Sequence, residues 1–182
     1  MVSSQRMPEG HFEYGRMIVV LFQGEGGNCA PYRKHLERMG MLGSTATQRP
    51  PVELIEIKGV SRAEALDKME QVEQKIQLNF QESGGKATFV HIYCAGRAVL
   101  LDNLVQIKLL SLEAQPQFFP MEHCARNLCD GQNVMVWAVF NCGRNLHFTE
   151  EQAKAANESY SGDFFASRSG SNTLITHACR PG

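Results

Sequence analysis

Residues 17–40, MIVVLFQGEGGNCAPYRKHLERMG, carry the pattern that decides the fold of this 182-residue chain. The run from Met17 to Phe22 is entirely apolar, as is typical of a strand that is buried on both faces of a sheet. A glycine-rich turn follows, and Pro31 then begins a stretch with apolar residues at helical spacing that ends at Gly40. The stretch therefore predicts a buried strand, a turn and a short helix.

The same alternation continues to the end of the chain. Ser61 and Glu64 form a capping-box pattern at the start of an amphipathic stretch, which predicts a helix over residues 61–78. Residues 99–112 fit either a small hairpin or a strand with a short helix. Further strands are predicted over 52–57, 87–94, 134–140 and 172–178, and a further helix over 121–129. This alternation predicts an α/β fold, a three-layer sandwich whose mostly parallel sheet has helices on both faces.

Charge and apolar patterning exclude several classes of partner. The chain has 18 Lys and Arg against 19 Asp and Glu, a formal net charge of -1, and no basic stripe, so we expect no nucleic-acid partner. The longest apolar runs, at 17–22 and 134–140, are far shorter than the roughly 20 residues that cross a bilayer, so no membrane span is expected. Residues 1–16 contain no apolar signal core. The sequence therefore predicts an intracellular, cytoplasmic protein.

Neither a metal nor a cofactor is expected. Six cysteines are spread irregularly without a Cys-x-x-Cys pair, which does not fit a small disulfide scaffold. Cys94, Cys142 and Cys179 each lie at the end of an apolar run, so they are predicted to be reduced thiols packed as small apolar residues. His123, Cys124 and Cys129 are metal-binding residue types, but cysteines five positions apart on a helix point about 140° away from each other. The turn after the first strand lacks the spacing of nucleotide-binding loops, and Glu25 would repel a phosphate.

Two strand ends carry unusual sequences. In a parallel sheet of this kind, ligands and chemistry gather in the loops beyond the carboxyl ends of the strands. The third strand ends in Tyr93-Cys94-Ala95-Gly96-Arg97-Ala98, and the fourth ends in Val139-Phe140-Asn141-Cys142-Gly143-Arg144-Asn145. These motifs resemble the caspase and metacaspase family of cysteine peptidases. In that family the third strand ends in an apolar-Tyr-x-Ser-Gly-His-Gly turn with the general base. The fourth ends in Asp-x-Cys-Arg or Gln-Ala-Cys-Arg-Gly, with the nucleophile.

Further matches follow the order of the family along the chain. Residues 17–41 look like its opening strand, loop and helix, and Ser61-Arg-Ala-Glu64 is similar to its Thr-x-x-Glu second helix. Ala178-Cys-Arg-Pro-Gly182 resembles the Ala-Thr-x-Pro-Gly that ends a strand of the family's small subunit. The resemblance implies a caspase-like domain over residues 16–182, which follows an N-terminal extension over residues 1–15.

The resemblance places the catalytic dyad on residues that cannot do the family's chemistry. Arg97 stands at the position of the general base, and a guanidinium with a pKa above about 12 cannot accept a proton. Matching Asn141 to the family's Asp places Gly143 at the nucleophile. Asn141 then replaces the acidic residue with which metacaspases bind a basic substrate side chain. The resemblance therefore implies a degenerate site without catalytic residues.

An alignment that is shifted by one residue leaves an active enzyme open. It places Cys142 at the nucleophile, and His91 or His177 would then supply the base. His91 lies inside the third predicted strand, well below the carboxyl ends. His177 lies at the end of the fifth predicted strand, near the expected cleft, and is the better placed of the two.

The leading hypothesis is a catalytically inactive caspase/metacaspase-like domain that acts as a structural or protein-interaction subunit of a larger assembly. The alternative is a divergent cysteine endopeptidase that uses Cys142 with His177 or His91. A third hypothesis is an unrelated domain that binds a small ligand at the strand ends. Residues 159–171 resemble the intersubunit linker of the family. Family members continue beyond the position of Gly182 with two more helices and a further strand. We therefore expect missing C-terminal elements and a protein partner, in a homo- or hetero-oligomer, over that edge of the sheet, unless the sequence is a fragment.

Overall fold

The computed structural model contains seven strands and three helices within residues 14–42, 52–101, 104–110, 116–128, 133–144 and 172–178, which are the residues that the structure describes. The strands are β1 (Tyr14–Gln23), β2 (Val52–Lys58), β3 (Ala87–Leu101), β4 (Leu104–Lys108), β5 (Phe118–Phe119), β6 (Val134–Arg144) and β7 (Thr173–His177). The helices are α1 (Ala30–Arg38), α2 (Arg62–Glu82) and α3 (Met121–Asn127).

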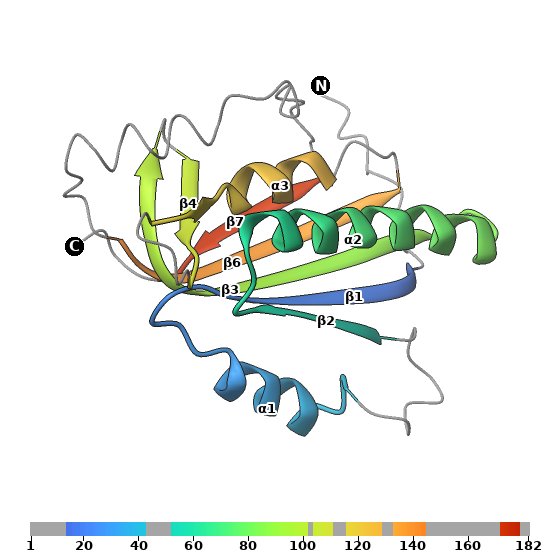
Figure 1. Cartoon of the computed structure of the whole chain (residues 1–182). Helices are drawn as coiled ribbons and strands as arrows, with labels where there is room; N and C mark the ends of the chain where they lie inside the picture. The colour runs from blue at the N-terminus through green and yellow to red at the C-terminus, as the bar shows by residue number, and fades with distance from the viewer. Residues whose placement is uncertain are drawn as a thin grey trace, which may run out of the picture.

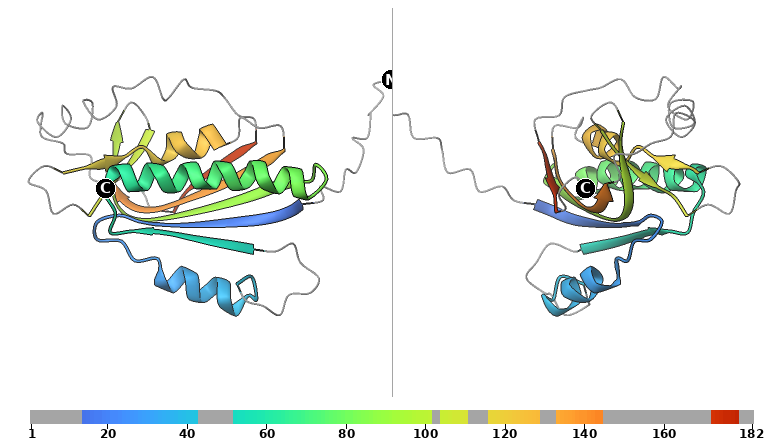
Figure 2. Two further views of the ribbon diagram at one scale, coloured as in Figure 1. Left: turned by 45° about the vertical axis from the view of Figure 1, so that its right-hand side comes forward. Right: turned by 90° about the vertical axis from the view of Figure 1, so that its left-hand side faces the viewer.

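The strands form one sheet with β3 at its centre. β3 pairs in parallel with β1 on one side and with β6 on the other, and β2 and β7 pair in parallel outside these two. α1 lies on one face of the sheet, whereas α2 and α3 lie on the opposite face (Figures 1 and 2). The predicted α/β three-layer sandwich with a mostly parallel sheet is therefore confirmed.

β3 is longer than the sequence predicts, because its last residues form a hairpin. β4 pairs in antiparallel orientation with β3 from Ala98 onward, and Ala98 also pairs with Arg144 of β6. β4 therefore occupies the place beside β3 that lies beyond the end of β1. The short β5 pairs with β4 and extends this antiparallel part. Of the two interpretations of residues 99–112, the structure has the hairpin.

α2 begins where the capping box predicts. The Ser61 hydroxyl accepts a hydrogen bond from the backbone N–H of Glu64, and the Glu64 carboxylate accepts one from the backbone N–H of Ser61, at 3.3 and 2.8 Å. The helix ends at Glu82 rather than at residue 78, before Gly84 and Gly85 take φ angles of 70° and 90°. Its inward face packs against the sheet through Ala65, Met69, Val72 and Ile76.

Side chains along each strand alternate between two apolar layers, one on each face of the sheet. In β3, Cys94 and Ala98 pack in the layer beneath α2 and α3, whereas Tyr93 packs in the layer beneath α1. In β6, Phe140 and Cys142 both belong to the α2 and α3 side. This alternation decides which of the strand-end side chains can meet.

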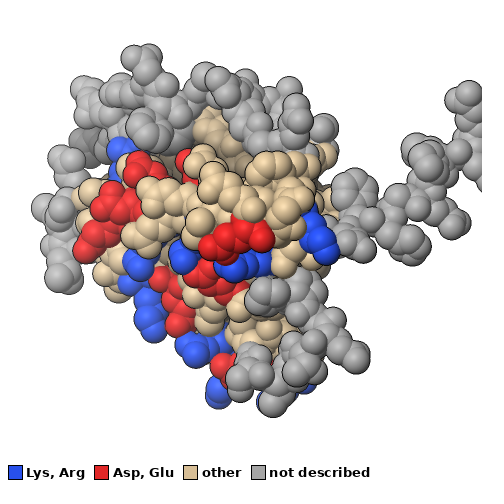
Figure 3. Space-filling model, turned by 90° about the vertical axis from the view of Figure 1, so that its right-hand side faces the viewer, with Lys and Arg blue, Asp and Glu red and all other residues tan. Residues whose placement is uncertain are grey.

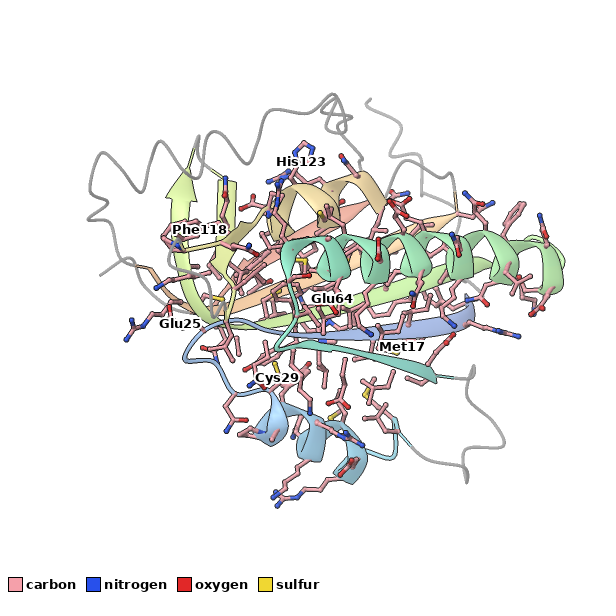
Figure 4. All side chains as sticks on the ribbon, in the orientation of Figure 1. Met17, Glu25, Cys29, Glu64, Phe118 and His123 are labelled. Carbon is pink, nitrogen blue, oxygen red and sulfur yellow. The ribbon has the colours of Figure 1, made fainter. Side chains whose placement is uncertain are left out.

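The glycine-rich turn over residues 24–27 packs its backbone directly against β3. The N–H of Gly24 donates to the carbonyl oxygen of Ala95 at 2.9 Å. A Cβ atom on Gly27 would lie only 2.1 Å from that same oxygen, which no side chain can tolerate. The glycines therefore permit a close backbone approach at the carboxyl end of the sheet, where Figure 4 shows the neighbouring Glu25.

Charged side chains of both signs are interspersed on the face that Figure 3 presents. Two ion pairs join the helices to β2: Arg33 of α1 lies 2.8 Å from Glu56, and Lys75 of α2 contacts Glu53. Exposed pairs of this kind contribute at most about 1 kcal/mol each, so the apolar layers hold the helices in place. None of the described helices is long and apolar enough to cross a membrane.

Replacing Gly27 with alanine tests the close approach of the turn. Gly27→Ala should lower the free energy of unfolding by about 2–4 kcal/mol, because the new Cβ would collide with backbone atoms of Ala95 that cannot move independently. Urea denaturation measures the change. Gly143→Ala is the control, since a Cβ there meets no atom of the described residues within 4 Å, and it should change stability by no more than about 0.5 kcal/mol. Equal stability of the two variants would contradict the packing.

Candidate functional site

The candidate site lies where the carboxyl ends of β3 and β6 run side by side. In the parallel register of these strands, Gly96 pairs with Cys142, and Arg97 pairs with Gly143. The alignment that matches Asn141 to the family's Asp assigns the catalytic dyad to Arg97 and Gly143. These two positions are therefore direct neighbours on adjacent strands. Under the shifted alignment, the nucleophile position lies beside Gly96 instead.

Arg97 is exposed and lies on the α1 side of the sheet, next to the glycine-rich turn. Its backbone N–H donates to the carbonyl oxygen of Glu25 at 2.9 Å, and a Cβ on Gly26 would lie 3.8 Å from its Nε. The Glu25 carboxylate is paired with Lys108 at 2.7 Å. Among the described residues, no carboxylate forms an ion pair with Arg97. Gly143 has no side chain, and a Cβ there would meet no atom of the described residues within 4 Å.

Cys142 lies on the opposite face of the sheet from Arg97. Its side chain is 1% exposed and belongs to the apolar layer beneath α2 and α3. The thiol lies 3.6 Å from the carbonyl oxygen of Cys94, which accepts its weak hydrogen bond. A nucleophile must reach its substrate, and this thiol faces the core instead.

His91 is buried on the α1 side, and hydrogen bonds occupy both of its ring nitrogens. Nδ1 lies 3.1 Å from the carbonyl oxygen of Trp137, and Nε2 lies 2.6 Å from the hydroxyl of Tyr32. A carbonyl oxygen can only accept, so Nδ1 carries the proton, and Nε2 accepts the hydrogen bond of Tyr32. Burial lowers the pKa of His91, which favours this neutral ring, while the Trp137 carbonyl partly opposes the shift.

The structure does not bring His91 and Cys142 together. His91 packs against Tyr32 of α1, whereas Cys142 packs beneath α2 and α3. The sheet itself separates the two side chains, so they form no dyad.

His177 ends β7 on the same side of the sheet as Cys142. It pairs in register with Phe140, and its ring stacks on the Phe140 ring with a centroid distance of 5.5 Å. The carbonyl oxygen of Phe140 also accepts the backbone N–H of Ala178, so the chain passes close to β6 at this point. His177 is exposed while Cys142 is buried, which gives the two residues different surroundings.

A polar and aromatic cluster that the sequence did not reveal lies beside Arg97. The side-chain amide of Asn141 donates to the hydroxyl of Tyr93 at 2.8 Å, and the Tyr93 ring stacks on Tyr32 with centroids 3.9 Å apart. Tyr93 belongs to the strand-end motif, and alternation along β3 could have placed it on the face of Arg97. Tyr32 lies on a helix, and its contact with β3 has no signal in the sequence.

Burial disfavours the thiolate form of three described cysteines. Burial raises the pKa of Cys29 to about 11 and that of Cys124 to about 12, and it raises the pKa of Cys94 well above the usual range. Cys29, Cys94, Cys124 and Cys142 are all free and buried. The predicted packing as small apolar residues is therefore confirmed for Cys94 and Cys142, while Cys179 lies outside the described residues.

Within the described ranges, no group of three His, Cys, Asp or Glu side chains is placed to hold a metal ion. The structure does not describe Cys129, the final residues 179–182, or residues 159–171, which resemble the intersubunit linker. So does most of the predicted extension over 1–15, although β1 already begins at Tyr14. No protein-family model matches the chain, and no curated protein matches its sequence.

The buried, neutral His91 predicts a pH-dependent stability. Its folded pKa lies below the ordinary value of 6.5, so the unfolded chain binds more protons as the pH falls through that value. The His91 contribution is present above pH 6.5 and should be lost progressively below it. Urea denaturation across this range should show a shallower pH dependence in His91→Gln than in the wild type. His35→Gln removes an exposed imidazole of α1 and should keep the His91 contribution; identical pH profiles for wild type and His91→Gln would refute it.

Proposed function

We propose that the chain is a catalytically inactive caspase/metacaspase-like domain that acts as a structural or protein-interaction subunit of a larger assembly. The observation that carries this proposal is the pairing of Arg97 with Gly143 at the strand ends. The guanidinium cannot take a proton from a nucleophile, and glycine offers no nucleophile. Asn141 beside them is neutral, so it supplies no charge for a basic substrate side chain. This arrangement favours binding over hydrolysis.

The surroundings of Cys142 support the same proposal. Its thiol is buried in an apolar layer, while the chemistry of a cysteine peptidase needs a thiolate that can reach the scissile carbonyl. His91 lies across the sheet from it. A peptidase that uses Cys142 with His177 is the alternative, and it requires the thiol to leave its place beside Cys94.

An intracellular, cytoplasmic location is part of the proposal. Its support is the state of the four described cysteines, all of which are free. Free thiols are typical of compartments that keep cysteines reduced.

The proposal includes a protein partner at the β7 edge of the sheet. β7 pairs with β6 alone among the described strands, and alternation along the ladder turns the backbone groups of Ile175 away from β6. Leu174 pairs in register with Trp137, and these two side chains are 60% and 38% exposed. A strand edge beside exposed apolar side chains is a surface that partner chains commonly cover.

An inactive domain should neither cleave peptides nor react with a peptide-based thiol electrophile at Cys142. The native chain is incubated with the electrophile, and the labelled cysteine is identified by mass spectrometry, alongside a cleavage assay on a peptide library. The urea-unfolded chain is the control and should become labelled, because unfolding exposes the thiol. Stoichiometric native labelling at Cys142 together with peptide cleavage, both lost in Cys142→Ala, would establish the peptidase instead.

The edge proposal predicts that the purified chain self-associates and that a charge at position 174 prevents it. Sedimentation velocity of Leu174→Lys should give the monomer, because a lysine on an edge strand disfavours pairing with another chain. Leu110→Lys is a matched control, since Leu110 is 59% exposed against 60% for Leu174, and it should associate like the wild type. A wild-type chain that is a stable monomer at all accessible concentrations would count against the partner.

A further inference from the structure

β2 lies at one margin of the sheet, and half of its backbone groups point away from β1 (Figures 1 and 2). Gly24, directly after β1, donates its N–H to the carbonyl oxygen of Ala95 at 2.9 Å, so even-numbered residues of β1 direct their backbone groups toward β3. Its odd-numbered residues therefore face β2. In the register that pairs Val19 with Leu54, the backbone groups of Leu54 and Glu56 then point outward, where no described strand pairs with them.

Apolar side chains border this edge on both faces of the sheet. Val52 and Leu54 pack against the apolar layer beneath α1, and Ile55 packs against the layer beneath α2 and α3. All three side chains are only partly buried. A strand that pairs with β2 would set its own side chains beside them and remove further apolar surface from water.

Only one charge of β2 has no ion-pair partner among the described residues. Charged side chains protect many sheet edges, but Glu53 contacts Lys75 of α2, and Glu56 lies 2.8 Å from Arg33 of α1. Lys58 is exposed and forms no ion pair with a described residue. The edge therefore presents apolar side chains followed by an unpaired positive charge.

The sequence of β2 does not match β2 of a second copy. Antiparallel pairing of the whole strand, across a two-fold axis at Ile55, would place Leu54 against Glu56 and Val52 against Lys58. An axis at Leu54 would place Val52 against Glu56, and an axis at Glu56 would place that carboxylate against its own copy. Axes closer to either end would pair only the last few residues. The edge therefore fits a strand of different sequence.

We propose that the β2 edge binds an extended segment of a protein partner, which pairs antiparallel with β2 and sets an acidic side chain against Lys58. The segment exchanges backbone hydrogen bonds with Leu54 and Glu56, and its apolar side chains face Val52, Leu54 and Ile55. Antiparallel pairing is the more stable orientation per residue. The site lies at the opposite margin of the sheet from β7, so this inference goes beyond the partner proposed there.

NMR titration of the full chain tests the site with three peptides that are blocked at both ends. Glu-Thr-Thr-Val-Val-Thr-Val matches the edge, and its two relatives carry glutamine or lysine in place of glutamate. We expect saturable shifts with the glutamate peptide, largest for the amide signals of Leu54 and Glu56. The amide of Ile55 between them should shift less, because it points toward β1. Affinity should fall in the order glutamate, glutamine, lysine.

Variants of β2 separate strand pairing from general association. Lys58→Glu should weaken binding of the glutamate peptide about fivefold and make the lysine peptide the tightest ligand, because the charge opposite the peptide is reversed. Arg38→Glu reverses an exposed charge of α1 and should keep the original order of the peptides. Leu54→Pro removes an outward N–H, which an edge strand tolerates, and should weaken binding at least about tenfold. Circular dichroism shows whether each variant is folded.

The proposal is overturned if no peptide gives saturable shifts, if Lys58→Glu keeps the order of the peptides, or if a folded Leu54→Pro binds as the wild type does. Should Leu54→Pro not fold, Lys58→Glu decides alone. The same titration in Leu174→Lys should give the same affinities, because the site does not involve the β7 edge. Peptide cleavage by the wild type would refute the inactive domain, whereas loss of peptide binding would refute only the β2 site.

Discussion

The parallel pairing of β3 with β6 is the constraint on which the rest of the structure depends. The pairing runs without interruption from Thr88 and Val134 to Ala98 and Arg144. Because side chains alternate along both strands, this pairing fixes the face on which Tyr93 to Ala98 and Val139 to Gly143 lie. It places Arg97 and Gly143 side by side toward α1, and it turns Cys142 into the opposite apolar layer. The chemistry open to the site follows from this separation.

The α1 side tolerates polar groups because a short network satisfies them. His91 would be costly to bury with an unpaired nitrogen, at about 1–3 kcal/mol, but Tyr32 and the Trp137 carbonyl occupy both ring nitrogens. The hydroxyl of Tyr32, through its hydrogen bond to His91, also joins α1 to the central strand β3. The α2 and α3 side is different, since there the strand positions hold apolar side chains and thiols whose pKa is raised by burial. One sheet therefore has a polar side and a largely apolar side at the same strand ends.

Much of the fold could be predicted because its signals are local. The apolar run at 17–22 and the capping box at Ser61 and Glu64 identify their elements without reference to the rest of the chain. The extension of β3 to Leu101 could not be predicted in this way, since it depends on β4, which takes over where β1 ends. The two alignments of residues 141–144 with the family motif, which differ by one residue, lead to different predictions for the nucleophile position. A shift of one residue in a strand moves a side chain to the other face. The sequence could therefore predict that Cys142 packs as a small apolar residue, but only the structure shows that it lies on the opposite face of the sheet from Arg97.

The glycine-rich turn links this geometry to the charge of the site. Its tight packing on β3 is possible only because Gly27 has no side chain, and it carries Glu25 to a position where the backbone contacts Arg97 while the carboxylate reaches Lys108. In a looser turn, the Glu25 carboxylate could pair with either Lys108 or Arg97. The pairing with Lys108 leaves the guanidinium without an ion-pair partner among the described residues, at the position that the sequence resemblance assigns to a general base. Because Glu25 pairs with Lys108, no carboxylate among the described residues neutralises the positive charge of Arg97 at the strand ends.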